Sequence, residues 1–354
     1  MTAASSTSVY ESSEGRSREF DLRHMDTVIH VEDLKMHFPI TKGLLKRQVG
    51  SVYAVDGVSF DVPRGKTLGI VGESGSGKST IGHCLLKNYD ITSGKILFEG
   101  TDMASIKGST LRHVRNRVQM ITQDPYSSLD PRTNVLDTVT EGVRIHKMSS
   151  NKEEIEQIAI RQLELVGIDP DFRYRYPHEF SGGQRQRICI ARALALNPSF
   201  IVCDEIVSAL DVSIQAQIVT LMMQLQEQMH LTYVFIGHDL SVVRHISHQV
   251  AVMYLGKFME LTDSEELYDN PLHPYTQALI SAAPIPNPTV DRQRERILLQ
   301  GEIPSPINPP KGCNFCTRCP YANDECREVE PEMIDVGNGH FVACHRVHAK
   351  GGAD

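Results

Sequence analysis

The stretch VGESGSGKST, from Val71 to Thr80, decides the fold of this 354-residue chain. It follows an apolar run and precedes a helical pattern, which predicts a strand, a loop and a helix in that order. Glycines let the loop come close to a ligand, and successive backbone N–H groups form an anion cradle at the helix start. The spacing G-x-x-x-x-G-K-S therefore predicts a phosphate-binding loop (P-loop), rather than a Gly/Ser surface loop with one lysine. The residues expected to hold the nucleotide phosphates are Gly72, Ser74, Gly75, Ser76, Gly77, Lys78, Ser79 and Thr80.

The amino-acid composition excludes some classes of protein. The net charge is −8, with 36 Lys and Arg residues against 44 Asp and Glu residues. This balance argues against a broad nucleic-acid surface, which is usually basic. We find no run of about 18 apolar residues, so no transmembrane helix is predicted. The first residues lack the charged and then apolar pattern of a signal peptide, so we expect the chain to stay in the cytosol.

Patterning along the chain predicts an α/β fold with three parts. Residues 1–27 are polar and are expected to be a disordered tail. Residues 28–286 form the main domain, in which strand–helix alternation implies a parallel sheet and residues 125–180 form a helical subdomain. Residues 287–354 combine a Pro-rich linker with a small Cys-rich C-terminal region. The predicted strands are Val28–His37, Val52–Val62, Thr67–Val71, Lys95–Phe98, Val118–Thr122, Phe200–Cys203, Tyr233–Ile236 and Gln249–Tyr254.

An acidic pair, Asp204-Glu205, follows the apolar strand Phe200–Cys203. A P-loop needs a carboxylate for magnesium and a residue that positions the attacking water. We expect Asp204 to hold Mg²⁺ together with Ser79, and Glu205 to act as general base. The alternative is that the pair only caps a helix.

A second candidate phosphate site is Ser181-Gly182-Gly183-Gln184, before the predicted helix Arg185–Leu196. A serine and two glycines at a helix N-terminus can bind phosphate. This motif alone is weak because it is common in loops, but it lies just upstream of the acidic strand.

These motifs together resemble those of the ABC-type ATPases. Phe180 to Gln184 is similar to the family's signature motif, although Phe180 replaces the commoner Leu. Ile206 stands where the family usually has Pro after the acidic pair. The resemblance implies the roles of the remaining site residues: Gln123 as the Q-loop glutamine that also reaches Mg²⁺, Asp211 in the D-loop Ser208–Asp211, His238 as the switch histidine, and Phe38 (or Tyr53) as the aromatic that stacks on adenine.

The resemblance also implies partners. In this family two ATPase domains pair head to tail, and each ATP lies between one P-loop and the other subunit's signature motif. One chain carries one of each, so a second ABC ATPase subunit is expected, which we predict to be a paralogue in a heterodimer. Gln123 and residues 124–133 are expected to couple hydrolysis to membrane subunits.

Two further stretches, Asp124–Arg132 and His273–Thr276, together with the Cys-rich tail, resemble the oligopeptide/dipeptide importer ATPases. This implies an ATP-hydrolysing subunit at the cytoplasmic face of the membrane, with two permease subunits and an extracytoplasmic binding protein. One alternative is an importer ATPase of the same kind that drives the uptake of nickel or another small solute. The other is a soluble ABC ATPase acting on DNA or ribosomes.

The eight cysteines are unevenly placed. Cys84, Cys189 and Cys203 lie in apolar surroundings and are predicted core residues. The other five crowd near the C-terminus, which in a cytosolic protein favours metal over disulfides. Their local spacing is compatible with an iron–sulfur cluster, with zinc, or with free thiols. The family resemblance implies a 4Fe–4S cluster on one set of four, leaving Cys316 as an extra: Cys313, Cys319, Cys326 and Cys344.

Overall fold

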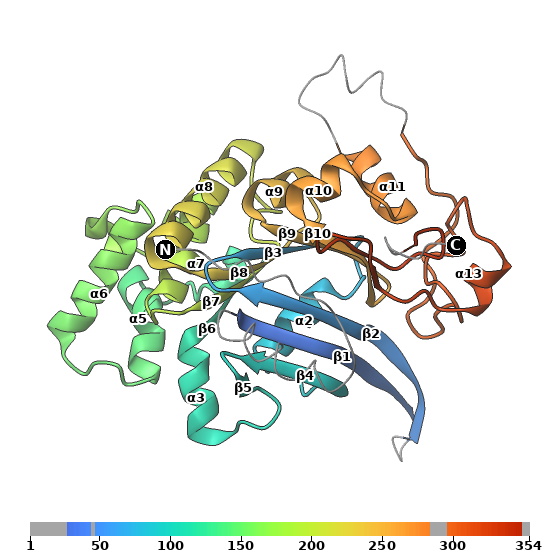
Figure 1. Ribbon diagram of the computed structural model, residues 1–354. Helices are drawn as coiled ribbons and strands as arrows, with labels where there is room; N and C mark the ends of the chain where they lie inside the picture. The colour runs from blue at the N-terminus through green and yellow to red at the C-terminus, as the bar shows by residue number, and fades with distance from the viewer. Residues whose placement is uncertain (1–26, 44–46, 284–295, 349–354) are drawn as a thin grey trace, which may run out of the picture.

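A computed structural model describes residues 27–43, 47–283 and 296–348 (Figure 1). The tail predicted for residues 1–27 therefore lies, apart from Thr27, outside the described residues. So does the first part of the predicted Pro-rich linker; from residue 296 to 310 the backbone forms neither helix nor strand.

The main sheet has eight strands in the order β11-β12-β10-β9-β3-β8-β7-β6. Its centre is β3 (Thr67–Val71), which pairs in parallel with β8 and β9. All five residues of β3 are buried, which explains why the strand reads as a continuous apolar run. The other strands are β6 (Val118–Ile121), β7 (Phe200–Asp204), β8 (Thr232–Ile236), β9 (Gln249–Tyr254), β10 (Lys257–Asp263), β11 (Ile334–Asp335) and β12 (Phe341–Val342). The parallel core predicted from strand–helix alternation is confirmed.

A second, antiparallel sheet has the order β2-β1-β4-β5 and lies beside the main sheet (Figure 1). Its strands are β1 (Thr27–Lys42), β2 (Arg47–Pro63), β4 (Ser93–Phe98) and β5 (Thr101–Asp102). The prediction that Phe38-Pro39 ends the first strand is wrong. Strand β1 continues because Pro39 pairs only with Ser51 of β2, while β4 reaches no further than Lys35. A proline is tolerated at such a free edge, where its missing N–H breaks no ladder.

Between β6 and β7 the chain forms only helices and turns. The helices are α4 (Pro125–Ser128), α5 (Val135–Ile145) and α6 (Lys152–Leu165), followed by two 3₁₀ turns, Pro170–Tyr174 and Pro177–Glu179. Asn134 and Asn151 start α5 and α6, because their side chains accept hydrogen bonds from the N–H groups of Asp137 and Glu153. Figure 1 shows these helices at one end of the sheet, next to α7.

The remaining helices lie, in chain order, between strands of the main sheet. They are α2 (Lys78–Leu85), α3 (Gly108–Arg117), α7 (Gly182–Leu194), α8 (Val212–Met229), α9 (Leu240–Ile246), α10 (Ser264–Asp269), α11 (Pro274–Ala282) and α13 (Asp324–Glu328). Within the described ranges, none of the helices combines the length and the apolarity that crossing a membrane would require.

The C-terminal region is built into the core. Strand β12 pairs with β10, so that residues 341–342 extend the main sheet. Phe315 is fully buried and its ring contacts Tyr254, Tyr275 and His273, with ring centroids 5.3 to 5.7 Å apart. Asn314 Nδ2 donates to the carbonyl of Leu255 over 2.8 Å. The C-terminal region thus shares its core with the main sheet.

A buried ion pair, His340–Glu260, ties β10 to the C-terminal region. Glu260 is fully buried, and its carboxylate accepts hydrogen bonds from the N–H groups of Leu272 and His273. His340 Nε2 lies 2.7 Å from Glu260 Oε1. Burial alone would lower the pKa of His340, but the hydrogen bonds and charges of Glu260 and Glu266 outweigh it and raise that pKa above its ordinary value.

This pair predicts a pH-dependent stability. Because the folded state raises the pKa of His340, its contribution is full below the unfolded pKa of about 6.5. It is lost as pH rises through the raised folded pKa. We expect His340→Gln to cost about 1–3 kcal/mol at pH 6, the worth of a charged hydrogen bond, and less at pH 9. Urea unfolding at the two pH values measures this difference. The exposed His245→Gln is the control, and an equal cost at both pH values would contradict the prediction.

Candidate active site

The P-loop follows β3, and at two of its positions the neighbouring backbone leaves room only for glycine. Gly72 has φ 153° and Gly77 has φ 107°. A Cβ atom at Gly72 would lie 2.0 Å from the carbonyl oxygen of Met253, and one at Gly77 would lie 2.0 Å from that of Ala54. Both positions therefore require glycine for steric reasons as well as for their backbone angles.

Lys78 lies at the start of α2 and is buried. Its ammonium donates to the carbonyl oxygens of Gly72 and Glu73, each over 2.9 Å. Burial lowers the pKa of Lys78, while nearby carboxylates oppose this shift. The cation is thus held inside the loop, where an anionic ligand would replace its carbonyl partners.

Ser79 and Asp204 meet at the end of β7. The Ser79 hydroxyl donates to Asp204 Oδ1 over 2.9 Å. Burial raises the pKa of Asp204, the hydrogen bond from Ser79 opposes this shift, and the charge of Glu205 adds to it by a smaller amount. A divalent cation would relieve this cost, since it neutralises charge and accepts hydroxyl and carboxylate oxygens as ligands. The side chains therefore fit the magnesium ion that the P-loop implies.

Glu205 is the centre of a polar cluster at the ends of β6, β7 and β8. Its Oε2 accepts from Gln123 Nε2 over 3.0 Å and lies 3.6 Å from His238 Nδ1. Glu205 itself has φ 49°, the left-handed region that costs strain for a residue with a side chain. The structure thus brings together the three residues predicted to be catalytic.

A small pocket adjoins this cluster. Its volume is about 30 Å³, and its lining includes Glu205, Ser208, Gly237 and His238. This is enough space for a water molecule, with a carboxylate and an imidazole at its wall. Its lining contains no residue of the P-loop.

The residues predicted to form the signature motif, Ser181–Gln184, lie apart from the Glu205 cluster. Ser181 caps α7: its hydroxyl accepts from Gln184 N over 3.3 Å, and its N–H donates to Gln184 Oε1 over 3.0 Å. Asp211 stands at the N-cap position of α8. Among the described residues, no hydrogen bond or ion pair joins Ser181–Gln184 or Asp211 to the P-loop. These residues do not complete the P-loop site of the same chain.

The two candidates for adenine stacking lie on neighbouring strands. Phe38 pairs with Val52, and His37 pairs with Tyr53, without a register shift between them. Because side chains alternate across a sheet, Phe38 and Tyr53 point to opposite faces. Only one of them can contact the nucleotide, and Phe38 stays the predicted one.

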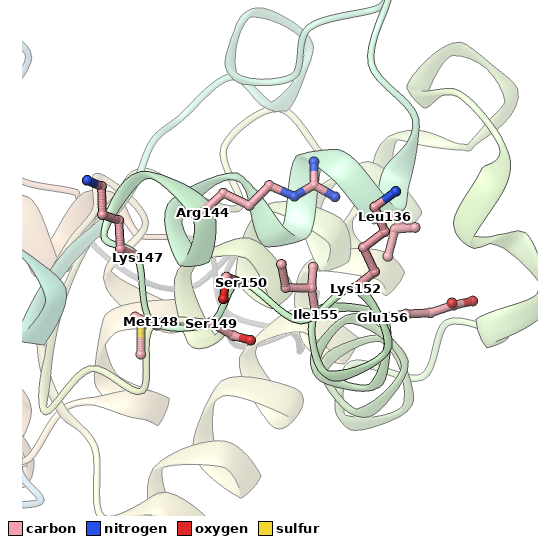
Figure 2. A pocket seen from close by; sticks show the side chains of 9 residues that line it. All are labelled: Leu136, Arg144, Lys147, Met148, Ser149, Ser150, Lys152, Ile155 and Glu156. Atoms are coloured by element: carbon pink, nitrogen blue, oxygen red, sulfur yellow. The ribbon is translucent and has the colours of Figure 1, made fainter.

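A pocket of about 990 Å³ lies in the helical region, away from these residues. Figure 2 shows its lining side chains, which come from α5, α6 and the loop between them and include Arg144, Lys147 and Lys152. It holds none of the predicted ATP-site residues.

The predicted iron–sulfur cluster is not supported. Across residues 27–43, 47–283 and 296–348, no group of three or more His, Cys, Asp or Glu side chains is arranged to hold a metal ion. Cys313, Cys316 and Cys326 instead pack in the core. Burial, with the neighbouring thiols as smaller causes, raises the pKa of Cys313 to about 12. The four ligands predicted for the cluster were Cys313, Cys319, Cys326 and Cys344.

Sequence reasoning missed one set of contacts at the P-loop. The carboxylate of Glu73, the residue after Gly72, forms an ion pair with Arg318, and its N–H donates to Tyr275. Nothing local predicts this, since Glu73 and Arg318 are 245 residues apart.

The features described so far are those of a P-loop nucleotide hydrolase. Residues 55–208 match the ABC transporter family model, and residues 259–326 match that of the oligopeptide/dipeptide transporter C-terminal region. Over 323 residues the chain is 56% identical to the oligopeptide transport ATP-binding protein AppF of Bacillus subtilis (strain 168), covering 91% of this chain and 98% of that protein.

A second relative is the probable peptide ABC transporter ATP-binding protein y4tS of Sinorhizobium fredii, with 51% identity over 90% of both chains. Among solved structures, the chain resembles the dimeric ATP-binding cassette MJ0796 in a post-hydrolysis state bound to ADP and Pi. The TM-score is 0.58 and the identity 25%, over 67% of this chain and 98% of that one. The chain belongs to the oligopeptide/dipeptide transporter group of ABC transporter ATP-binding proteins. The ABC ATPase fold and the ATPase activity expected from the sequence are confirmed.

Loss of the P-loop cation tests this site. We expect Lys78→Ala to weaken ATP binding about 10- to 100-fold, because one or two charge-assisted hydrogen bonds to phosphate are lost. Equilibrium binding of a fluorescent ATP analogue to the full-length chain measures the change. Lys66→Ala is the matched control, since Lys66 is exposed at the opposite end of β3. Unchanged affinity in Lys78→Ala would contradict the P-loop assignment.

Proposed function

We propose that this chain hydrolyses ATP at the Glu205 cluster and so drives uptake of oligopeptides or dipeptides, as a peripheral subunit at the cytoplasmic face of the membrane. The observation that carries the hydrolytic part is the convergence of Gln123, Glu205 and His238 beside the P-loop. The peptide substrate class rests on the relatives, which are named for peptide or oligopeptide transport. These names favour peptides over nickel as the solute.

In the proposed mechanism the N–H groups of the P-loop bind the phosphates and Phe38 stacks on adenine. Lys78 turns from its carbonyl partners to the outer phosphates. Ser79, Asp204 and Gln123 would hold Mg²⁺, which when bound neutralises phosphate charge. Glu205 takes a proton from the attacking water, and His238 orients the group that Glu205 activates.

The second half of each site comes from another subunit in this proposal. In the described part of the chain no hydrogen bond or ion pair joins Ser181–Gln184 or Asp211 to the P-loop, which supports a head-to-tail pair. We propose a heterodimer with a paralogous ABC ATPase. The cassette MJ0796 is itself described as a dimer.

The remaining partners in this proposal are two permease subunits and an extracytoplasmic binding protein, without nucleic acid. Gln123 and residues 124–133 would transmit the ATP cycle to the permeases. Residues 28–286 would act as the ATPase domain and residues 287–354 as a C-terminal region. The iron–sulfur cluster is left out, because no ligand set converges in the described part of the chain.

Replacing Glu205, the proposed general base, distinguishes ATP binding from ATP hydrolysis. We expect Glu205→Gln to bind ATP normally and to slow hydrolysis about 100-fold or more, the usual worth of general-base catalysis. Phosphate release by the assembled transporter measures this. Glu227→Gln, an exposed change on α8, is the control. Normal turnover in Glu205→Gln would remove Glu205 from the mechanism.

Uptake by cells tests the substrate class. We expect cells that carry Lys78→Ala in place of the wild-type protein to lose uptake of a labelled dipeptide or oligopeptide, while nickel uptake stays at the wild-type level. Lys66→Ala cells should behave as the wild type. Loss of nickel uptake with normal peptide uptake would contradict peptide transport.

A further inference from the structure

Every polar group of Glu73, inside the P-loop, is held by a partner. Its N–H donates to the Tyr275 hydroxyl over 2.9 Å, and its carbonyl accepts from Lys78 Nζ over 2.9 Å. Its carboxylate accepts two hydrogen bonds from the guanidinium of Arg318, of 2.6 and 3.1 Å. Two of these three partners, Tyr275 and Arg318, come from the far C-terminal part of the chain. The P-loop is therefore bound to structure outside the nucleotide-binding motifs.

Arg318 is rigidly placed for this contact. Its side chain is only 8% exposed. Its N–H donates to the carbonyl of the buried Phe315 over 3.0 Å, and its guanidinium lies 3.4 Å from the Tyr254 hydroxyl. A planar guanidinium held in this way matches a carboxylate through two parallel hydrogen bonds, which a lysine cannot form. The pair is thus specific in geometry as well as in charge.

The C-terminal region also contacts strand β2 next to the P-loop. The N–H of Tyr53 donates to the carbonyl of Pro306 over 2.9 Å. Tyr53 adjoins Ala54, whose carbonyl lies against Gly77 of the P-loop. The same region thus contacts the strand that carries one adenine candidate and, through Arg318, the phosphate loop.

The charge of Glu73 matters for ATP. Lys78 Nζ donates to the carbonyl of this same residue over 2.9 Å, so the carboxylate belongs to a residue that directly contacts the P-loop cation. Without Arg318, this half-buried carboxylate would compete with phosphate for Lys78 and would repel the incoming anion. Arg318 removes that competition by forming the ion pair.

We propose that Arg318 is a positioning residue for ATP hydrolysis: it neutralises and anchors Glu73, so that the C-terminal region sets the affinity of the P-loop for ATP. This inference rests on the proposed ATP site. It assigns to the C-terminal region a role in nucleotide binding.

The test uses the full-length chain for binding and the assembled transporter for turnover. We expect Arg318→Ala to raise the Kd and KM for ATP about tenfold, which corresponds to losing one charge-assisted interaction. The fall in kcat at saturating ATP should be smaller than this rise in KM. Arg318→Lys should recover part of the affinity, because it restores the charge but not the paired hydrogen bonds. Lys311→Ala is the control, since its exposed ion pair with Glu328 lies in the same region.

A double variant distinguishes the effect of the Glu73 charge from a structural effect of losing Arg318. We expect Glu73→Gln combined with Arg318→Ala to bring the ATP affinity back to within about threefold of the wild type, because no uncompensated carboxylate remains. Wild-type affinity in Arg318→Ala would overturn the proposal. So would an affinity that stays low in the double variant, because the uncompensated Glu73 carboxylate would then not explain the loss.

A wrong assignment of the ATP site would give a different experimental result. If Lys78→Ala bound ATP normally, the P-loop assignment would be wrong, whatever Arg318 does. Circular dichroism of each variant shows whether it is folded. Should Arg318→Ala alone fail to fold, the comparison of the double variant with Arg318→Lys still decides the question. Equal affinity to the wild type in the double variant supports the proposal, and low affinity there contradicts it.

Discussion

The close approach of the P-loop to two other backbone segments is the constraint on which the rest of the site depends. Gly72 and Gly77 leave no room for a Cβ against Met253 and Ala54, which belong to β9 and β2. This contact fixes the loop relative to both sheets at once. The carboxyl ends of β3, β6, β7 and β8 meet at one edge of the main sheet, so Lys78, Asp204, Gln123 and His238 are brought to one place by parallel pairing.

The charged side chains at that edge lie close together, which has an electrostatic cost. Individual cations offset this cost for individual carboxylates. Asp204 and Glu205 are adjacent carboxylates with the same sign, and burial disfavours the charge of both Asp204 and Lys78. Lys78 and, by the chemistry of the donor set, a divalent cation offset the acidic pair. Glu73 adds a third carboxylate, which Arg318 pairs separately. The site is thus balanced by one cation from its own motif and one from the distant C-terminal region.

Sequence patterns predicted the central parts of the structure because those parts obey local rules. The limits of β3 and β9 agree with the prediction to the residue, since both are short apolar runs bounded by polar turns. Glu205 was predicted from its place directly after an apolar strand, whereas Gln123 and His238 were assigned through the resemblance to the ABC-type ATPases. The extension of β1 past Pro39 was missed, because only sheet pairing reveals that this proline lies on a free edge. The contacts of Arg318 and Tyr275 with Glu73 were missed for a related reason: they join segments far apart in the chain, and no pattern in either segment indicates them.

The insertion of β3 between β8 and β9 also sets the order in which the protein can acquire its site during synthesis. A ribosome that has made the first 230 residues has released the whole P-loop motif, but neither neighbour of β3 exists yet. Until β8 emerges, neither edge of β3 has its native partner, and the edge facing β9 lacks one until Tyr254 emerges. Unpaired edges of this kind favour aggregation. The ion pair with Glu73 needs a further 64 residues, up to Arg318. The nucleotide site is therefore among the last parts of the molecule to be completed, although its defining motif is among the first to be translated.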